Sequence, residues 1–383
     1  MSKFSQIWAT EMDHLRAARP VDPVLYFAPE ALVRTQRRFR SGFPGAVTYA
    51  VKANDNAGVI DTLAKGGMQA FDVASPVEID AVRALVPGAV LHYNNPVRGG
   101  WEIAHAVQAG VASYSVDGLG ELAKLVEAVP KGAEMSVRLA LPVEGAAYHF
   151  GEKFGEGPEG AVELLRAVVA AGYVPSMTFH VGTQCADPAA WTRYIETCAE
   201  VAREAGVRLA RLNVGGGFPS DRGRGAALEP IFAAIRAAVS HAFPEDRPEL
   251  LCEPGRAMVA DAFTAAFKVK AERACGALFL NDGIYGLLAE LPIIGPHQRL
   301  RVVTEGGTLR EGPTRPYVLY GPTCDSLDKL PDTVDLPETT REGDYVIFDG
   351  IGAYSTATNT RFNGYGSHEV VTVRRSGHRA SGG

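Results

Sequence analysis

Residues 69–95 read QAFDVASPVEIDAVRALVPGAVLHYNN and contain one complete strand–helix–strand unit. The runs QAFDVA (69–74) and VLHYNN (90–95) are short and rich in β-forming residues, which predicts two strands. The segment between them, PVEIDAVRALV (76–86), spaces its apolar residues like an amphipathic helix. This unit therefore predicts an α/β fold in which strands and helices alternate.

The same alternation continues on both sides of this unit, with helical patterns such as 119–129 and 160–172 between the strands. The predicted strands are VTYAV (47–51), QAFDVA (69–74), VLHYNN (90–95), SYSVD (113–117), MSVRLAL (135–141), PSMTFHVG (175–182), RLNVGGG (211–217) and ELLCEPG (249–255). Eight strand–helix units in roughly 210 residues favour a (β/α)8 TIM-type barrel. A doubly wound open sheet alternates in the same way and remains the alternative. The missing GxGxxG turn disfavours its nucleotide-binding form.

The secondary-structure pattern of the sequence changes after about residue 260. Short β-type runs separated by Gly, Pro and Asp turns replace the helical patterns, which predicts a second, all-β domain. These runs are 265–274, 300–306, 315–321, 344–350 and 368–375. We expect a barrel over 28–262 and a β-rich domain made of 1–27 and 263–383, with a strand and a helix in 24–39 joining the two. The tail 377–383 is expected to be disordered.

Composition excludes several classes of protein. Of the 383 residues, 46% are hydrophobic and 21% charged, which is enough for two packed domains. The net charge of −6 argues against nucleic-acid binding. The five cysteines are widely spaced without a CxxC pair, so we expect no disulfide framework and no metal site. The polar N-terminus and the absence of long apolar runs predict a cytoplasmic protein that does not bind membranes.

Lys52 ends the first strand of the predicted barrel, within VTYAVKAN (47–54). Active residues of such barrels lie at the carboxyl ends of the strands. Burial there lowers the pKa of a lysine amine and makes it a competent Schiff-base nucleophile. The local pattern alone favours a plainer interpretation, a lysine that extends into solvent at the barrel rim.

Three further strand ends carry unusual residues. His180 could stack on a planar cofactor, although a buried structural histidine has the same pattern. Gly215, Gly216 and Gly217 favour an anion-binding turn, commonly for phosphate, over a simple tight turn. Glu253 could face the pyridine nitrogen of a cofactor and Arg256 a phosphate; a structural Glu–Arg pair is the alternative.

Eight strings in this order resemble the fold-type III pyridoxal-phosphate (PLP) decarboxylases, the ornithine/lysine/diaminopimelate decarboxylase family. The strings are VTYAVKAN, FDVASPVEI, KFG at 153–155, HVGTQ, NVGGGFP, EPGR, GPTCDSLD, and GAY followed by FNGYG. They span residues 47–366, nearly the whole chain. The resemblance implies a PLP-binding barrel whose β domain completes the active site and the dimer interface.

The resemblance also assigns roles by position. It implies that Lys52 carries PLP, that His180 stacks on its ring and that Glu253 partners its pyridine nitrogen. The remaining implied cofactor contacts are Asp72 near the lysine with Glu78 supporting it, Arg138 beside the pyridoxal hydroxyl, and Gly215, Gly216, Gly217, Gly255, Arg256 and Tyr354 around the phosphate.

Members of this family are head-to-tail homodimers with shared active sites. The resemblance implies that Cys324 of one subunit protonates the substrate carbon in the other site after CO2 leaves, and that Asp325 and Tyr354 contact substrate. It implies a salt bridge between Lys153 and Asp328 across the interface. The partners expected are thus an amino-acid substrate and a second copy of the chain.

The substrate implied is a basic L-amino acid, with decarboxylation of ornithine to putrescine for polyamine biosynthesis placed first. Asp325, where diaminopimelate decarboxylases carry Glu, favours a substrate that ends in an amine. Eukaryotic-type members hold that amine with an aromatic–Asp pair, whereas this chain has Ile293 and Ile294 at that spacing. Glu290 is the nearby acid that could replace it. Lysine, diaminopimelate and a modified diamino acid remain alternatives.

Three other classes remain open. A PLP-dependent racemase on the same barrel would share the lysine and the phosphate site, but the CDSLD and GAY segments are not expected in it. A non-catalytic PLP carrier would lack the β domain. A generic barrel whose motifs coincide by chance is the third alternative.

Overall fold

A computed structural model describes residues 7–142, 153–223, 225–295 and 297–374. The chain divides into two compact units. The barrel unit comprises 36–219 and 227–257; the β unit comprises 1–35, 220–226 and 258–383. The β unit thus includes residues 28–35, 220–226 and 258–262, all of which lie inside the range that we expected for the barrel. The predicted tail 377–383 lies outside the described residues.

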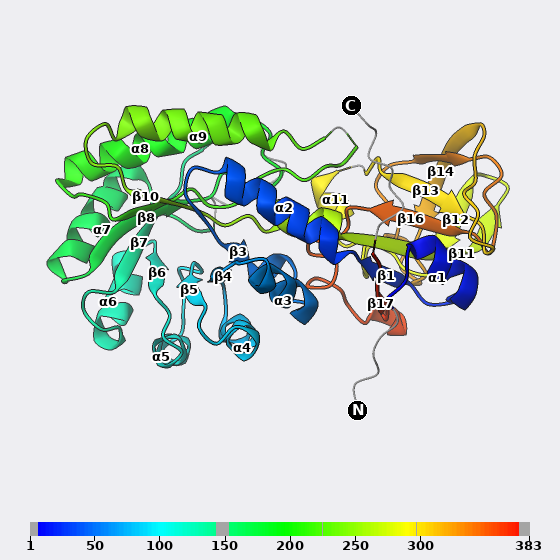
Figure 1. Cartoon of the computed structure of the whole chain (residues 1–383), viewed down its shortest axis with the longest axis horizontal. Coiled ribbons are helices and arrows are strands. Elements are labelled where there is room, and N and C mark those ends of the chain that lie inside the picture. The colour runs from blue at the N-terminus through cyan, green and yellow to red at the C-terminus, as the bar shows by residue number, and fades with distance from the viewer. Residues whose placement is uncertain (1–6, 143–152, 224, 296, 375–383) are drawn as a thin grey trace. The chain divides into compact units, whose positions relative to one another are not determined.

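The barrel unit holds a parallel sheet that closes on itself (Figure 1). Its strands are β2 (Ala46–Val47), β3 (Tyr49–Ala50), β4 (Ala70–Val73), β5 (Val90–Tyr93), β6 (Ser113–Val116), β7 (Glu134–Leu139), β8 (Val174–Phe179), β9 (Arg211–Asn213) and β10 (Glu249–Cys252). Each strand from β3 to β10 pairs with the next, and β10 pairs back to β2. Since only Thr48 separates β2 from β3, these two form one strand and the barrel has the eight that the sequence predicts. A doubly wound sheet is excluded because such a sheet has open edges.

Helices follow the strands in the expected alternation. They are α2 (Pro29–Gly42), which the unit boundary divides at Gln36, then α3 (Ala57–Lys65), α4 (Pro76–Leu85), α5 (Gly100–Gln108), α6 (Leu119–Ala128), α7 (Pro158–Ala170), α8 (Pro188–Ala205), α9 (Leu228–Ala242) and α10 (Arg256–Val259). In α4 the Ser75 side chain caps the first turn and Pro76 occupies its first position. Ile79 and Val82 of α4 are buried, which confirms the amphipathic pattern of 76–86.

The β unit contains an eight-stranded sheet. Its strands are β1 (Val24–Phe27), β11 (Phe263–Arg273), β12 (Ala277–Leu280), β13 (Leu300–Val303), β14 (Thr314–Tyr320), β15 (Val334–Pro337), β16 (Tyr345–Asp349) and β17 (Glu369–Thr372). The five β-type runs and the strand in 24–39 are confirmed. The sequence prediction missed β12, β15, and the short helices α1 (Glu11–Ala18) and α11 (Leu291–Ile294).

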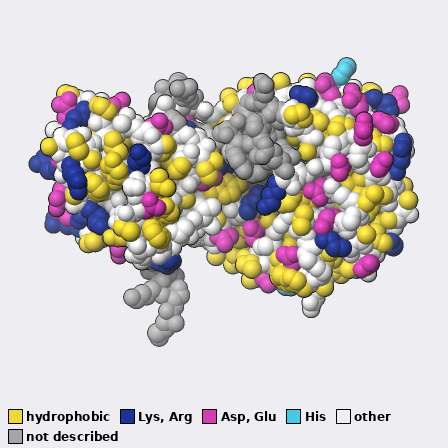
Figure 2. Space-filling model, turned by 180° about the vertical axis from the view of Figure 1, so that it is seen from behind, with side chains coloured by type: hydrophobic (Ala, Val, Ile, Leu, Met, Phe, Trp, Pro, Cys, Tyr) yellow, Lys and Arg dark blue, Asp and Glu magenta, His cyan; other side chains and the backbone are white. Residues whose placement is uncertain are grey.

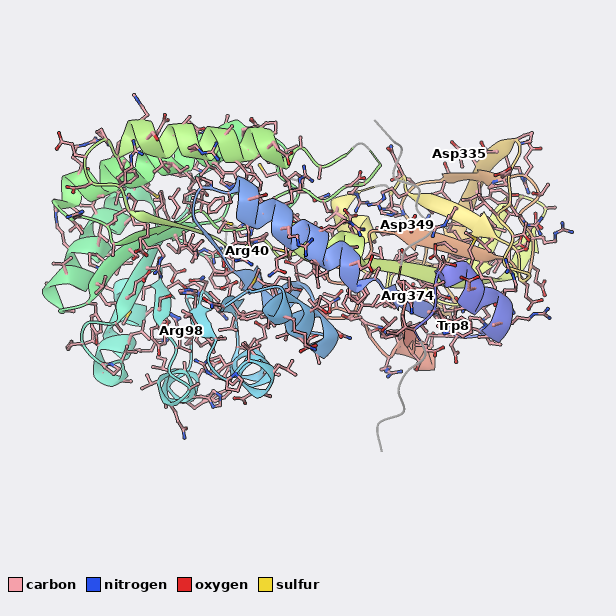
Figure 3. The ribbon with its side chains drawn as sticks, viewed as in Figure 1. Trp8, Arg40, Arg98, Asp335, Asp349 and Arg374 are labelled. Carbon is pink, nitrogen blue, oxygen red and sulfur yellow. The ribbon has the colours of Figure 1, made fainter. Side chains whose placement is uncertain are left out.

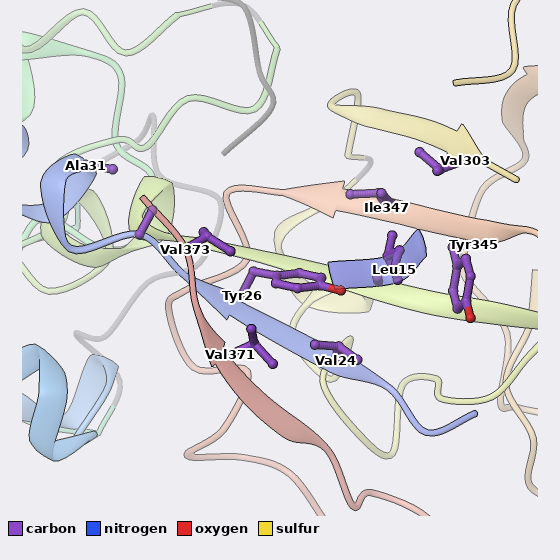
Figure 4. Close-up of a cluster of buried hydrophobic side chains, with 11 residues drawn as sticks. Leu15, Val24, Tyr26, Ala31, Val303, Tyr345, Ile347, Val371 and Val373 are labelled. Atoms are coloured by element: carbon purple, nitrogen blue, oxygen red, sulfur yellow. The ribbon is translucent and has the colours of Figure 1, made fainter. Parts of the chain in front are cut away.

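The N-terminal residues are anchored in the β unit by a hydrophobic core (Figure 4). Tyr26 of β1 and Leu15 of α1 lie in this core with Val303, Tyr345 and Ile347. Strand β1 pairs antiparallel with β11 and parallel with β17, so the two ends of the chain meet in one sheet.

The described helices include none long and apolar enough to cross a membrane. On the face shown in Figure 2, basic and acidic side chains are interspersed. This pattern differs from the continuous basic stripe typical of a nucleic-acid-binding surface.

Candidate active site

Lys52 and Asp72 lie together at the carboxyl end of the barrel strands. The register of β3 and β4 places Ala50 opposite Asp72, so Lys52 follows two residues beyond that pair, in a short 3-10 helix (Val51–Ala53). The Lys52 Nζ lies 3.5 Å from Asp72 Oδ2. The Asp72 side chain is only 2% exposed, whereas that of Lys52 is 42% exposed. A buried carboxylate thus holds an amine that remains accessible.

Glu253 follows β10 directly and is buried at 5% exposure. Burial and the neighbouring Asp72 carboxylate raise the pKa of Glu253 well above its usual value, while Lys52 and Arg138 lower it. Asn94 Nδ2 lies 3.2 Å from Glu253 Oε2, and Asn213 Nδ2 lies 3.5 Å from Oε1. The sequence prediction named Glu253 but neither asparagine.

A third acid, Glu78, is partly buried and supports this group. Glu78 Oε2 accepts a hydrogen bond from the Ala74 N–H at 2.7 Å, in the turn between β4 and α4. Burial raises the pKa of Glu78 to about 7, and the neighbouring Asp72 adds to this shift. The three acids Asp72, Glu78 and Glu253 therefore form one electrostatically coupled cluster around the Lys52 amine.

His180 follows β8 and faces the same group of residues. Burial and the cations Lys52 and Arg138 lower the pKa of His180 well below its usual value, so the ring is neutral at pH 7. Its Nδ1 accepts a hydrogen bond from the Gly182 N–H at 3.1 Å, which places the ring proton on Nε2. A neutral, fixed imidazole at this position can stack on a planar ring.

The three glycines after β9 form a turn that no other residue fits. Gly215 and Gly217 have positive φ angles of 69° and 84°. A Cβ on Gly215 would lie 2.1 Å from the Phe179 carbonyl oxygen, and one on Gly217 would lie 2.3 Å from that of Gly182. A Cβ on Gly216 would lie 2.9 Å from the Glu253 carbonyl oxygen. The turn therefore lies directly against the segments that carry His180 and Glu253.

Two arginines adjoin this turn and the acidic cluster. Arg256 begins α10, is 8% exposed, and its Nε donates to Thr183 Oγ1 at 3.3 Å. Arg138, on β7, has its pKa lowered by burial, while Glu253, Asp117 and Asp72 oppose that shift. The sequence prediction did not name Thr183, although it stands inside the quoted string HVGTQ.

Gly255 brings the EPGR segment against the lysine-bearing segment. A Cβ at Gly255 would lie 2.9 Å from the Ala53 Cβ and 3.3 Å from the Ala50 Cβ. Close approach of the two backbones is thus the physical reason for a glycine at this position.

Arg98 is a buried arginine that the sequence prediction did not single out (Figure 3). It is 2% exposed, and its guanidinium donates to the backbone oxygens of Tyr93 and Ser115, near the ends of β5 and β6. Its Cζ lies 5.0 Å from the centre of the Tyr93 ring. Arg98 therefore fixes the strand end from which Asn94 projects.

Two of the predicted residues of the β unit, Cys324 and Asp325, lie in one cluster within that unit. The Tyr285 hydroxyl donates to Asp325 Oδ2 at 2.5 Å, and this hydrogen bond lowers the pKa of Asp325. The exposed Cys324 donates its backbone N–H to Asn363 Oδ1 at 3.0 Å. The segments 281–286, 324–325 and 360–363 thus converge, as the Tyr285–Phe362 ring contact at 5.0 Å also indicates.

Two further residues of this unit have distinctive backbone positions. Tyr354 adopts a left-handed conformation with φ of 58°. Glu290 precedes α11 as its N-cap residue, and Ile293 in that helix is 59% exposed. The roles assigned to Tyr354 and Glu290 stay predictions.

The Asp328 carboxylate forms its hydrogen bonds inside the β unit. It is 1% exposed, and its carboxylate accepts hydrogen bonds from the backbone N–H groups of Ile284 and Thr323 and from the Thr323 hydroxyl. These bonds join the 283–284 turn to the segment that carries Cys324. These bonds give Asp328 a structural role inside its own unit, and the expected pair with Lys153 across an interface stays a prediction.

Comparisons with known proteins identify the family to which the chain belongs. The family model of the pyridoxal-dependent decarboxylase, pyridoxal binding domain, matches residues 30–260. Ornithine decarboxylase of Mus musculus is 32% identical, covering 85% of this chain and 74% of that protein. Antizyme inhibitor 2 of Xenopus laevis is 31% identical, covering 87% and 77%. The structure of lysine/ornithine decarboxylase complexed with putrescine from Vibrio vulnificus superposes with a TM-score of 0.80 at 28% identity, covering 94% of this chain and 96% of that one. The chain belongs to the pyridoxal-dependent decarboxylase family.

Proposed function

We propose that this protein decarboxylates a basic L-amino acid with PLP, and that ornithine is the first substrate to test. One observation carries the proposal. A lysine amine, two buried carboxylates and a turn that only glycine fits lie together at the strand ends of one barrel. One relative is named as an inhibitor, antizyme inhibitor 2, so membership of the family alone does not decide the activity. The presence of the residues that the chemistry needs is therefore the decisive point.

The residues present fit the cofactor. The Lys52 amine suits its aldehyde, the buried Glu253 suits its ring nitrogen, and the Gly215–Gly217 turn with Arg256 suits its phosphate. Asp72 Oδ1 is buried without a hydrogen-bond partner among the described residues, so a further donor can be accommodated there. When bound, PLP supplies an electron-accepting ring that takes up the electron pair left by departing CO2.

Each of the barrel residues has a separate proposed role in binding or orienting the cofactor. Lys52 provides the amine that attaches the cofactor, and Asp72 holds that amine by charge. Glu253 would hold the proton on the ring nitrogen of the bound cofactor, and the positive charge of that nitrogen would in turn favour the ionised carboxylate against the effect of burial. His180 is neutral and held at Nδ1, and it would cover one face of the bound ring and exclude water from that face.

The β unit supplies groups of the right charge for a cationic substrate. Because Tyr285 donates a hydrogen bond to Asp325, the carboxylate is ionised well below neutral pH and can pair with a distal ammonium. Cys324 is exposed and carries the thiol proposed to return a proton to the substrate carbon. Glu290 is the second acid proposed for the distal amine.

A second copy of the chain is the proposed source of these β-unit groups in each active site. Exposed apolar side chains lie at the starts of neighbouring barrel helices: Val77 in α4, Trp101 in α5 and Leu119 in α6 are 75%, 68% and 56% exposed. In the β unit, Leu327 beside the CDS segment and Phe362 are also exposed. Apolar patches of this kind are typical of protein interfaces, which supports a homodimer with shared sites.

The test is a substrate panel. Protein supplied with PLP is incubated with the L and D forms of ornithine, lysine, arginine, diaminopimelate and 2,3-diaminopropionate, and released CO2 and amine are measured. We expect CO2 and putrescine from L-ornithine. Release from diaminopimelate alone would contradict the role of Asp325. Racemisation without CO2 would make the protein a racemase, and no reaction with any compound would favour a non-catalytic carrier.

A further inference from the structure

Each carboxylate oxygen of Glu253 faces the side-chain amide of an asparagine. Asn94 follows β5 and its Nδ2 lies 3.2 Å from Oε2; Asn213 ends β9 and its Nδ2 lies 3.5 Å from Oε1. In both contacts the asparagine Nδ2 donates to a carboxyl oxygen, which is the arrangement that an ionised carboxylate requires. Two strands that both precede β10 in the chain, β5 and β9, thus supply one donor each.

Other contacts fix the side-chain amide of Asn213 and the backbone of Asn94. Asn213 Oδ1 accepts the Gly215 N–H at 2.9 Å, so a flip of this amide would lose two hydrogen bonds. The backbone N–H of Asn94 donates to the Val73 oxygen at 3.2 Å, and Arg98 holds the preceding residue through the Tyr93 oxygen at 3.3 Å. The Asn213 donor is therefore oriented, and the strand end that carries Asn94 is held, before any ligand binds.

The charges around Glu253 explain why neutral donors suit this position. Burial and the Asp72 carboxylate on β4 oppose the ionisation of Glu253. Lys52, and Arg138 on β7, favour it. An additional cation at Asn94 or Asn213 would compete with a protonated ring nitrogen for the same carboxylate. An aspartate at either position would add another negative charge beside Asp72 and Glu253. An amide favours the ionised carboxylate without either effect.

We propose that Asn94 and Asn213 are positioning residues that aim Glu253 at the cofactor's ring nitrogen and favour its ionised form. This inference rests on the proposed function, because it concerns the same site. It adds two residues that neither the motifs nor the family resemblance assigned.

The test compares Asn94→Ala and Asn94→Asp with Asn95→Ala as the matched control. Asn95 is the next residue, but its side chain contacts the Ala74 oxygen and the Val97 N–H instead of Glu253. The readouts are the dissociation constant of PLP and the pH at which the absorbance of the bound cofactor changes. Circular dichroism confirms that each variant is folded.

We expect Asn94→Ala to bind PLP about tenfold more weakly and to move the spectral midpoint upward by about one pH unit, because Glu253 loses a donor to its ionised form. Asn94→Asp should move the midpoint further in the same direction. Asn95→Ala should leave both quantities unchanged. Asn94→Gln, which retains an amide donor, should recover part of the loss.

The outcomes separate this inference from the proposed function. If the unmodified protein binds PLP and releases CO2, but folded Asn94→Ala and Asn94→Asp keep its PLP affinity and midpoint, the inference is wrong and the proposed function stands. If the unmodified protein binds no PLP, the proposed function is wrong and the inference fails with it.

Discussion

The ammonium of Lys52 lies 3.5 Å from the buried carboxylate of Asp72, on a strand adjacent to its own. Removing a carboxylate from water is unfavourable unless a cation pairs with it, so each group stabilises the position of the other. Asp72 also raises the pKa of Glu253. One carboxylate is thereby linked to both proposed ends of the cofactor, its aldehyde and its ring nitrogen.

Asp72→Asn should separate these two effects. Lysine loses its charged partner, so we expect kcat to fall roughly 100-fold through misplacement of the reacting amine. The pKa of Glu253 falls, because a neighbouring negative charge that raised it is gone. Glu253 then stays ionised to lower pH, and the acidic limb of kcat/KM moves to lower pH. The measurement is a pH profile, with Asp61→Asn on the surface of α3 as the control.

Gly215→Ala should damage both stability and cofactor binding. The alanine would have to adopt a φ near 69° and place its Cβ 2.1 Å from the Phe179 oxygen. We expect the free energy of unfolding to fall by about 2 kcal/mol or more, measured by urea denaturation. Gly120→Ala is the control: it lies at the exposed start of α6 with nothing within 4 Å of an added Cβ. It should raise stability by about 0.5–1 kcal/mol, and equal effects at both positions would contradict the strained turn.

Tyr285→Phe should weaken substrate binding without abolishing the reaction. The change removes the hydroxyl that donates to Asp325, so the carboxylate loses its fixed direction and its pKa returns toward the usual value. We expect KM for the basic substrate to rise roughly tenfold with a smaller change in kcat. Tyr365→Phe removes a hydroxyl elsewhere in the β unit, where it lies 3.4 Å from Lys270 Nζ, and should change neither constant. An unchanged KM for Tyr285→Phe would argue against Asp325 as a substrate contact.

The barrel could be predicted from the sequence because the pattern that identifies each of its strands and helices lies within that element. Each strand–helix unit between 45 and 255 carries its own apolar pattern, and the order of the units alone determines which strands pair. The β unit was predicted less completely. Strand β12 is only four residues long, and its pairing with β11 shifts register between Val269 and Ala271. Helix α1 contains few apolar residues. Neither element therefore has a periodic pattern strong enough to identify it.

The same distinction holds for the candidate site. Lys52, Glu253 and the glycine turn stand in motifs that are readable along the chain. Asn94 and Asn213 matter through Glu253, which lies 159 and 40 residues away from them in sequence. Arg98 resembles a surface arginine until the strand ends that it joins are known. Contacts of this kind arise from the closure of the barrel and have no local signature.

Mixing two inactive variants tests whether active sites are shared between copies. Lys52→Ala removes the barrel amine and Cys324→Ala removes the β-unit thiol, so each homodimer should have very low activity. If each site takes its barrel residues from one copy and Cys324 from the other, a mixed dimer has one site with both residues intact. After dissociation and reassociation of an equal mixture, about a quarter of the original activity should return, because half of the dimers are mixed and each has one complete site. Mixing Lys52→Ala with Lys52→Arg is the control and should restore nothing. Failure of the first mixture to regain activity, with mixed dimers demonstrated by mass spectrometry, would show that each copy completes its own site.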